Sequence, residues 1–207
     1  MKKLFILVFS VFSLVSFAQS KYELGMQKAM QQWQAGKPVE AKAILDRVAA
    51  SDKENWIPVY YKVFIDITSG FANPKASDIE EVIERNRSII EQWMTTGSEE
   101  WYVLKGMNET LELITDPMNK GMTQTPIINK AYEQAVKLNP NNPRAVYSLA
   151  SFQINSAKFM KVDMPYYCQM LEKSIVLFDQ QKSDVPFYPS WGKDWALKTQ
   201  ELCKGKQ

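Results

Sequence analysis

The sequence predicts an all-α protein, an αα solenoid of about nine helices, and three observations lead to this fold class. First, residues 131–149 form a helix-turn-helix unit, in which one helix stops at Pro140 and an amphipathic helix starts near Pro143. Second, apolar residues recur every three to four positions along most of the chain, as on a helix with one buried face. Third, no segment shows the alternation of a half-buried strand. Because one hairpin cannot bury its apolar stripe alone, the hairpins are expected to stack.

The first residues are predicted to be an export signal. A positive start, Lys2 and Lys3, precedes an apolar run over residues 4–17, and small residues end it at Ala18. The run is short for a membrane span, which needs roughly 20 residues. No cysteine follows it, so lipidation of the bacterial lipoprotein type is not expected. The sequence therefore predicts a signal peptide over residues 1–18, one domain over residues 19–207 and an exported protein, with the periplasm favoured over the cell surface or secretion.

The first five helices follow from local signals. Residues 22–35 and 38–50 form a hairpin that Gly36 interrupts. Residues 55–68 are apolar on most faces, which is typical of a central helix. Ser77 to Glu80 has the pattern of a capping box that starts a fourth helix, and a fifth follows. The inward stripe of the fourth and fifth helices is Ile79, Val82, Ile83, Asn86, Ile89, Ile90, Trp93, Trp101, Leu104, Leu111 and Ile114.

The second half is predicted to hold four more helices. Residues 116–122 are interpreted as the longest irregular segment, a plain connection with one acidic residue. The hairpin around residue 140 supplies the sixth and seventh helices. Asp163 is expected to cap an eighth helix, and Ser190 a ninth that ends near Lys204. Between them, residues 182–189 carry two prolines and are expected to be extended.

Composition excludes several classes of function. The chain contains no histidine, which removes Ser-His-Asp and Cys-His catalysis, imidazole-based zinc sites and ordinary haem ligation. Without Lys2 and Lys3 the 25 basic residues become 23, equal to the 23 acidic ones, and no basic face indicates nucleic-acid binding. Acidic pairs such as Glu80 with Glu81 lie at helix N-termini, which favour carboxylates without catalysis. We therefore expect a protein that is not an enzyme and that has no cofactor and no bound metal.

The cysteines are expected to form a disulfide. Cys168 and Cys203 are the only two in the chain, one near the start of the eighth helix and one near the end of the ninth. Antiparallel packing of these helices brings them together, and an exported protein meets an oxidising environment. Closing a loop of about 36 residues would stabilise the fold by roughly 3–4 kcal/mol in the chain-entropy model. The alternative is two buried free thiols.

At this point the chain resembles the tetratricopeptide repeat (TPR) family. From Asp116 onward it is also similar to exported bacterial TPR-like proteins of unassigned function. In those proteins a glycine-rich turn often follows the seventh helix. This chain departs from that pattern, because the corresponding residues 158–163 contain no glycine. The resemblance implies a right-handed αα solenoid of about four TPR-like hairpins with a closing helix, and it implies no reaction. The residues that carry it are Ala131 to Pro140, Pro143 to Ala150, Ala29, Gly36, Ala41, Leu45, Val48, Asp116 to Met118, Gly121, Leu138 to Arg144, Trp191, Gly192 and Cys203.

The same resemblance implies a concave groove lined by the first helix of each hairpin. It places Arg144, Tyr147, Ser151 and Asn155 there from the seventh helix, and Trp33 from the first. A groove of polar and aromatic residues suits peptide segments, and Arg144 can hold a carboxylate through two parallel hydrogen bonds. On this hypothesis Arg144→Glu abolishes partner capture without unfolding. The alternative is that Trp33 and Tyr147 belong to the core and Arg144 is a solvated cap residue.

Two functions remain after these arguments. The first is an exported, non-catalytic scaffold or adaptor that binds another protein or peptide in the cell envelope. The second is a binding module for a small ligand, peptide or glycan, with tryptophan rings as stacking platforms. A long open groove favours the first, and an aromatic-lined pocket of a few hundred Å³ favours the second. Two carboxylates facing each other across such a pocket would instead favour an enzyme.

Overall fold

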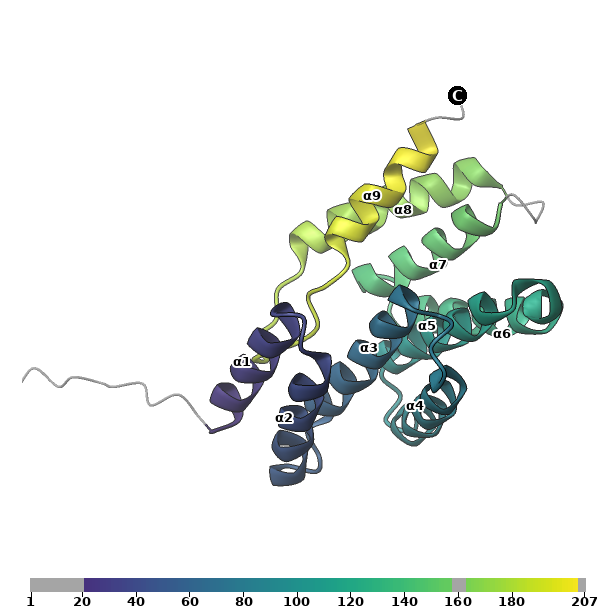
Figure 1. Cartoon of the computed structure of the whole chain (residues 1–207). Coiled ribbons are helices and arrows are strands. Elements are labelled where there is room, and N and C mark those ends of the chain that lie inside the picture. The colour runs from purple at the N-terminus through teal and green to yellow at the C-terminus, as the bar shows by residue number, and fades with distance from the viewer. Residues whose placement is uncertain (1–20, 158–162, 205–207) are drawn as a thin grey trace, which may run out of the picture.

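The computed structural model describes residues 21–157 and 163–204, so the predicted signal peptide at 1–18 and most of the predicted turn at 158–163 lie outside the described residues. Within these ranges the chain forms nine helices and no strand, which confirms the all-α class. None of these helices is long and apolar enough to cross a membrane. The helices, labelled in Figure 1, are α1 (Lys21–Gln34), α2 (Pro38–Ser51), α3 (Trp56–Ala72), α4 (Ile79–Met94), α5 (Glu99–Thr115), α6 (Pro117–Leu138), α7 (Pro143–Ser156), α8 (Met164–Gln180) and α9 (Lys193–Lys204).

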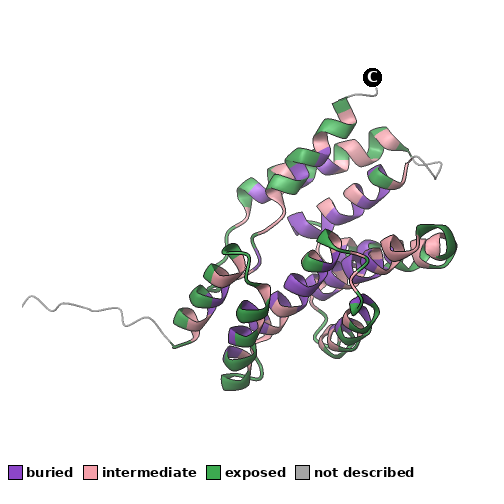
Figure 2. Ribbon diagram, viewed as in Figure 1, coloured by how far each residue is buried: buried purple, intermediate pink, exposed green. Residues whose placement is uncertain are grey.

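The helices pack in two overlapping series. Each helix packs against the next one along the chain, and α3, α5, α7 and α9 also pack against one another in that order. Stacked hairpins produce this pattern, because each buries its apolar stripe against its neighbour. Figure 2 shows the buried residues gathered on the faces where α3, α5 and α7 meet. The predicted right hand of the stack stays a prediction.

The centre of the core is α3, as its apolar faces predicted. Tyr60 and Phe64 are fully buried there, and Trp101 of α5 packs edge-on against Tyr60 with ring centroids 5.8 Å apart. Trp93 of α4 stacks on Trp101 at 5.7 Å. Such aromatic pairs stabilise a core by about 0.5–1.5 kcal/mol beyond the area that they bury. The aromatic core therefore joins α3, α4 and α5.

Two helix starts differ from the sequence prediction. The segment 116–122 is not a loop, because Asp116 caps α6 by accepting the N–H of Asn119 at 3.3 Å, and Pro117 suits the first turn. The predicted capping box at residues 77–80 is also wrong, since α4 begins after Asp78 without a side-chain cap bond.

The ninth helix begins later than predicted. It starts at Lys193 and not after Ser190. Gly192 has a φ of 114°, which is not a helical conformation, so the helix can begin only after this residue. A Cβ at Gly192 would lie 2.7 Å from the ring of Phe178, so only glycine fits between α8 and α9.

The segment between α8 and α9, residues 181–192, is named here the return segment. It runs back to the N-terminal hairpin, which lies far away in sequence, as Figure 1 shows beside α1. Tyr22 of α1 packs edge-on against Phe187 at 6.0 Å and donates a hydrogen bond to the Pro186 carbonyl at 3.4 Å. Phe187 has a φ of 60°, so the segment turns and is not extended as predicted. The first and last parts of the fold are thereby joined.

Candidate functional site

A half-open cleft of about 500 Å³ lies between α7 and α9, with α3, α5 and α6 also contributing to its wall. Its size is within the usual range of small-molecule sites, about 300–1,000 Å³. Most of its lining is apolar, and six aromatic residues contribute to it. They are Phe71, Tyr132, Tyr147, Phe152, Trp191 and Trp195.

One wall of the cleft is a pair of tryptophans. Trp191 is held on two sides, because it stacks on Phe64 at 4.5 Å and its indole N–H donates to the Tyr60 hydroxyl at 2.9 Å. Trp195 lies 5.2 Å from Trp191 and remains 39% exposed. One ring is therefore fixed by the core, and the other presents free aromatic surface to the cleft.

The other aromatic residues line the cleft because α5 and α6 approach closely. A Cβ at Gly106 of α5 would lie 2.2 Å from the Tyr132 ring, so glycine is what allows this approach. Tyr132 packs against Phe152 of α7 at 6.1 Å. Burial raises the pKa of Tyr132 well above its usual range, so its hydroxyl resists ionisation even in alkaline solution. This hydroxyl lies 3.4 Å from that of Thr110.

Three of the predicted groove residues line this cleft together. Tyr147, Ser151 and Asn155 follow one face of α7. The Ser151 hydroxyl donates to that of Tyr147 at 3.5 Å, and the Asn155 amide donates to the Ser151 carbonyl at 2.7 Å. These three residues thus share one face, as the TPR resemblance implied, while their role in binding a partner stays a prediction.

Arg144 requires a correction. Its side chain is fully buried, and it holds Glu100 of α5, also fully buried, through bonds of 3.0 Å from Nε and 2.6 Å from Nη2 to one carboxylate oxygen. Its remaining nitrogen donates to Gln181 at 2.9 Å, and the Tyr188 ring covers it at 5.5 Å. The carboxylate that Arg144 binds therefore belongs to this chain, and Arg144→Glu would place two acids in one buried site and unfold the protein.

This ion pair is the centre of a buried polar network. Asn142 donates to Glu100 at 2.6 Å, and Tyr60 donates to its other oxygen at 3.1 Å. Burial alone would lower the pKa of Arg144, but the Glu100 charge and its hydrogen bonds outweigh this and raise it. Burial, reinforced by the Glu100 charge, raises the pKa of Tyr60. The network joins α3, α5, α7 and the return segment.

Trp33 does not line the cleft. It is partly buried and packs edge-on against Phe64 with centroids 5.5 Å apart. The prediction that it joins the α7 residues in one groove is therefore wrong, and the alternative of a core role holds for this residue. The reason is that Phe64 of α3 holds Trp33 in the core, together with Trp191 of the return segment.

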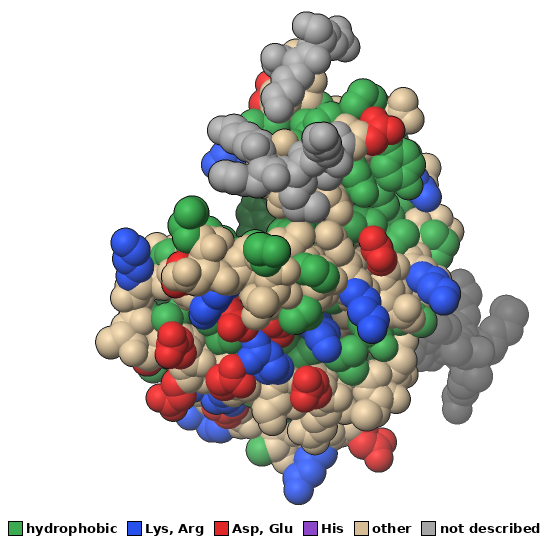
Figure 3. Space-filling model, turned by 90° about the vertical axis from the view of Figure 1, so that its right-hand side faces the viewer, with side chains coloured by type: hydrophobic (Ala, Val, Ile, Leu, Met, Phe, Trp, Pro, Cys, Tyr) green, Lys and Arg blue, Asp and Glu red, His purple; other side chains and the backbone are tan. Residues whose placement is uncertain are grey.

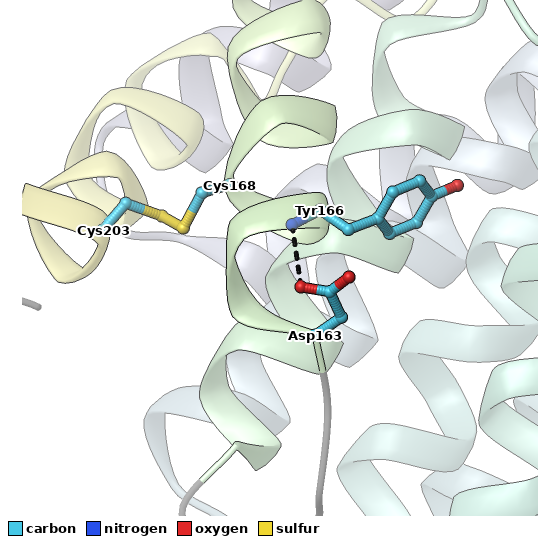
Figure 4. Close-up of a disulfide and its surroundings, with 4 residues drawn as sticks. All are labelled: Asp163, Tyr166, Cys168 and Cys203. Carbon is cyan, nitrogen blue, oxygen red and sulfur yellow. Dashed lines mark hydrogen bonds between the residues drawn. A yellow bond between two sulfur atoms is a disulfide. The ribbon is translucent and has the colours of Figure 1, made fainter. Parts of the chain in front are cut away.

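The predicted disulfide between Cys168 and Cys203 is confirmed (Figure 4). Their Cα atoms lie 5.9 Å apart, within the usual range for a disulfide. Asp163 caps α8 as predicted, by accepting the N–H of Tyr166 at 3.4 Å. The bridge ties the end of α9 to the start of α8, and α9 is the helix that supplies Trp195 to the cleft.

The sequence prediction did not include the cleft residues near the C-terminus, which are Trp191 just before α9 and Trp195, Lys198 and Thr199 within it. It gave the last helix only the role of closing the stack. The available signal was the pair of tryptophans four residues apart, which places both rings on one side of the chain at the start of a helix.

Charge is mixed over the surface. Figure 3 shows acidic and basic side chains intermingled in the lower part of one face, while hydrophobic side chains gather above, at the height of α8 and α9. Among residues 21–157 and 163–204, no cluster of three or more His, Cys, Asp or Glu side chains is arranged to hold a metal ion. The cleft between α7 and α9 combines an apolar, aromatic lining with the volume of a small-molecule site.

Comparison with known proteins supports the fold. No protein-family model matches the sequence, and no curated protein does, so the TPR resemblance stays a prediction. Among solved structures, the chain is similar to the HusA haemophore from Porphyromonas gingivalis, an all-helical bacterial protein, with a TM-score of 0.79 and 21% identity. The match covers 91% of this chain and 94% of that one. At this identity, the likeness shows a shared all-helical fold.

Proposed function

We propose that this protein is an exported binding module that takes a flat, largely apolar ring ligand of the porphyrin class in the cleft between α7 and α9. The observation that carries the proposal is the aromatic lining, in which Trp195 is exposed beside a fixed Trp191. A similar structure is that of a haemophore, which supports a ring ligand of this kind. The Cys168–Cys203 disulfide supports export, because such bridges persist in oxidising compartments.

The proposal favours the ligand-binding function over the adaptor. In the TPR-like arrangement, a partner's peptide would occupy the concave face beside Arg144. Here the protein's own return segment covers that arginine, through Gln181 and the Tyr188 ring. The aromatic cleft remains open to a small molecule.

Ring stacking has to supply most of the affinity. The chain has no histidine to ligate a haem iron, and Tyr132, Tyr147 and Met107 are the described lining residues whose side chains have ligand atoms for it. Trp195 is free to stack on one face of a planar ligand, with Tyr147 and Phe152 of α7 also lining the cleft. Binding by ring stacking and apolar contact does not alter the ligand chemically, so the protein is proposed to carry its ligand unchanged.

The test is titration of the purified, oxidised protein with hemin and with protoporphyrin, read by tryptophan fluorescence and by the Soret band. We expect quenching by both ligands, and a weakening of about tenfold in Trp195→Ala, since the lost stacking and apolar contact are together worth about 1.4 kcal/mol. Leu197→Ala is the matched control, because Leu197 is an exposed apolar residue of α9 that does not line the cleft. Absence of binding, or equal binding by both variants, would refute the proposal.

A further inference from the structure

We propose that the cleft selects ring ligands that carry an acidic group, and that Lys198 binds this group. The inference rests on the proposed function, because it concerns the same cleft. Beyond that function, it names the residue that sets specificity. It also names the chemical class of the ligand, which is an aromatic carboxylate or a comparable anion.

The first observation is the charge of the lining. Among the described residues that line the cleft, Lys198 is the single one with a full charge at neutral pH. The others are aromatic, aliphatic, hydroxyl or amide side chains. An anion that enters this cleft therefore meets one cation and no carboxylate.

The second observation is that Lys198 is unpaired. The other two lysines of α9 have partners, since Lys193 pairs with Asp179, and Lys204 with Glu201 at 2.7 Å. Lys198 forms neither an ion pair nor a hydrogen bond within the part of the chain that the structure describes. Its ammonium group is thus available to a ligand, while its aliphatic stem can lie along the ring surface.

The third observation is an unused hydroxyl on the α7 wall. Ser148 lines the cleft, is only 6% exposed and forms no hydrogen bond with any described residue. Among the described residues, its oxygen is not one of the side-chain atoms that are both buried and without a partner, so water in the cleft can reach it. A ligand that displaces this water has to offer a polar atom in its place or leave the hydroxyl unpaired, which supports a ligand that is amphipathic and not purely apolar.

Elementary electrostatics links these observations. A single exposed ion pair on a protein surface is worth little, because water screens it. Between a ligand and a lysine at the edge of an apolar cleft, the ring displaces water and the charge-assisted hydrogen bond becomes stronger. Lys198 therefore distinguishes acidic from neutral rings, and the tryptophans bind both.

The test uses two fluorescent dyes that share one ring skeleton, anilinonaphthalene sulfonate and the neutral phenylnaphthylamine. We expect the wild type to bind the anionic dye about tenfold more tightly, which is the effect of about 1.4 kcal/mol from a charge-assisted bond. Lys198→Gln should remove this preference and leave the neutral dye unaffected, whereas Lys198→Arg should retain it. Lys204→Gln is the matched control, since it removes the same charge from the same helix outside the cleft.

The outcomes separate this proposal from the proposed function. A preference for the anion that persists in Lys198→Gln, or no preference in the wild type, would overturn the assignment of Lys198 even if porphyrins bind. A preference that Lys198→Gln removes, in a protein that binds no porphyrin, would support the anion site and overturn only the porphyrin ligand. Protoporphyrin and its neutral dimethyl ester repeat the comparison with the proposed ligand class, and the acid should again bind more tightly.

Discussion

At the scale of single residues, the most consequential pair is Glu100 with Arg144. Both side chains are fully buried: Glu100 also accepts hydrogen bonds from Asn142 and Tyr60, and Arg144 also donates one to Gln181. A buried pair of this kind is costly to break, because the remaining charge has neither water nor a partner. The residue that the sequence suggested as a binding contact is therefore a structural one.

We expect Glu100→Gln to lower the free energy of unfolding by about 3 kcal/mol, since it leaves the buried Arg144 charge uncompensated. Urea denaturation followed by circular dichroism measures this value. Glu201→Gln serves as the control, because it breaks an exposed pair with Lys204 whose side chains are 65% and 62% accessible and should cost less than about 1 kcal/mol. Equal effects of the two changes would show that the buried pair does not stabilise the fold.

Tyr61 makes the protein sensitive to alkali. Burial raises its pKa from 10.0 to about 12. The pKa of Tyr61 is higher in the folded protein than in the unfolded one. The stability that comes from burying the neutral hydroxyl is therefore complete below pH 10.0 and is lost as the pH rises through about 12. Tyr61→Phe should behave as the wild type near pH 8 and unfold at higher temperature near pH 11. The measurement is the melting temperature of both proteins at several pH values across that range. If the two plots of melting temperature against pH run parallel, Tyr61 does not cause the sensitivity to alkali.

At the scale of elements, α9 is the least independently anchored part of the cleft. Only Ala196 and Thr199 are buried along its length, and its neighbours are α8 and α7. Trp191 holds the chain just before the helix, and the disulfide holds its far end. The cleft wall therefore depends on two anchors at opposite ends of a helix with a small core face.

We expect the oxidised protein to be more stable than the reduced one by roughly 3–4 kcal/mol, from the entropy of the closed loop. Reductant should lower the melting temperature and weaken ligand binding, because the end of α9 frays and Trp195 loses its position. The double variant Cys168→Ala with Cys203→Ala should show both effects without reductant and no further change with it. A melting temperature that is insensitive to reductant would show that the bridge does not stabilise α9.

At the scale of the whole molecule, the return segment converts a stack of hairpins into a closed unit. Stacked repeats normally contact only their neighbours, so they can unfold piecewise. Here two residues from the C-terminal quarter of the chain contact the N-terminal helices. Phe187 packs against Tyr22 of α1, and Trp191 packs against Phe64 of α3. The two ends of the stack are thus in direct contact through the return segment.

This closure predicts one cooperative unfolding transition. Circular dichroism and tryptophan fluorescence should give the same midpoint in urea for the wild type. In Trp191→Ala the two probes should separate, because α8 and α9 lose their link to the N-terminal helices. Trp191→Phe is the control, since it keeps the stack on Phe64 and loses only the hydrogen bond to Tyr60. Coincident transitions in the alanine variant would show that closure does not couple the two ends.

The sequence by itself determined the features that local chemistry dictates. The helical period placed nearly every helix, Asp163 is the expected cap, and the antiparallel last hairpin predicted the disulfide. The TPR resemblance also put Tyr147, Ser151 and Asn155 on one helix face, where the structure has them. Each of these depends on neighbours within a few turns, or on two adjacent helices.

Only the tertiary structure decided which of those residues are accessible. Phe64 of α3 holds Trp33 in the core. The burial of Arg144 and the wall that Trp191 gives to the cleft follow from the path of residues 181–192 across the stack. That path depends on contacts between residues more than a hundred positions apart, such as Trp191 with Tyr60. No local periodicity encodes such a contact, because its free energy comes from burial and hydrogen bonding that exist only once the helices have stacked.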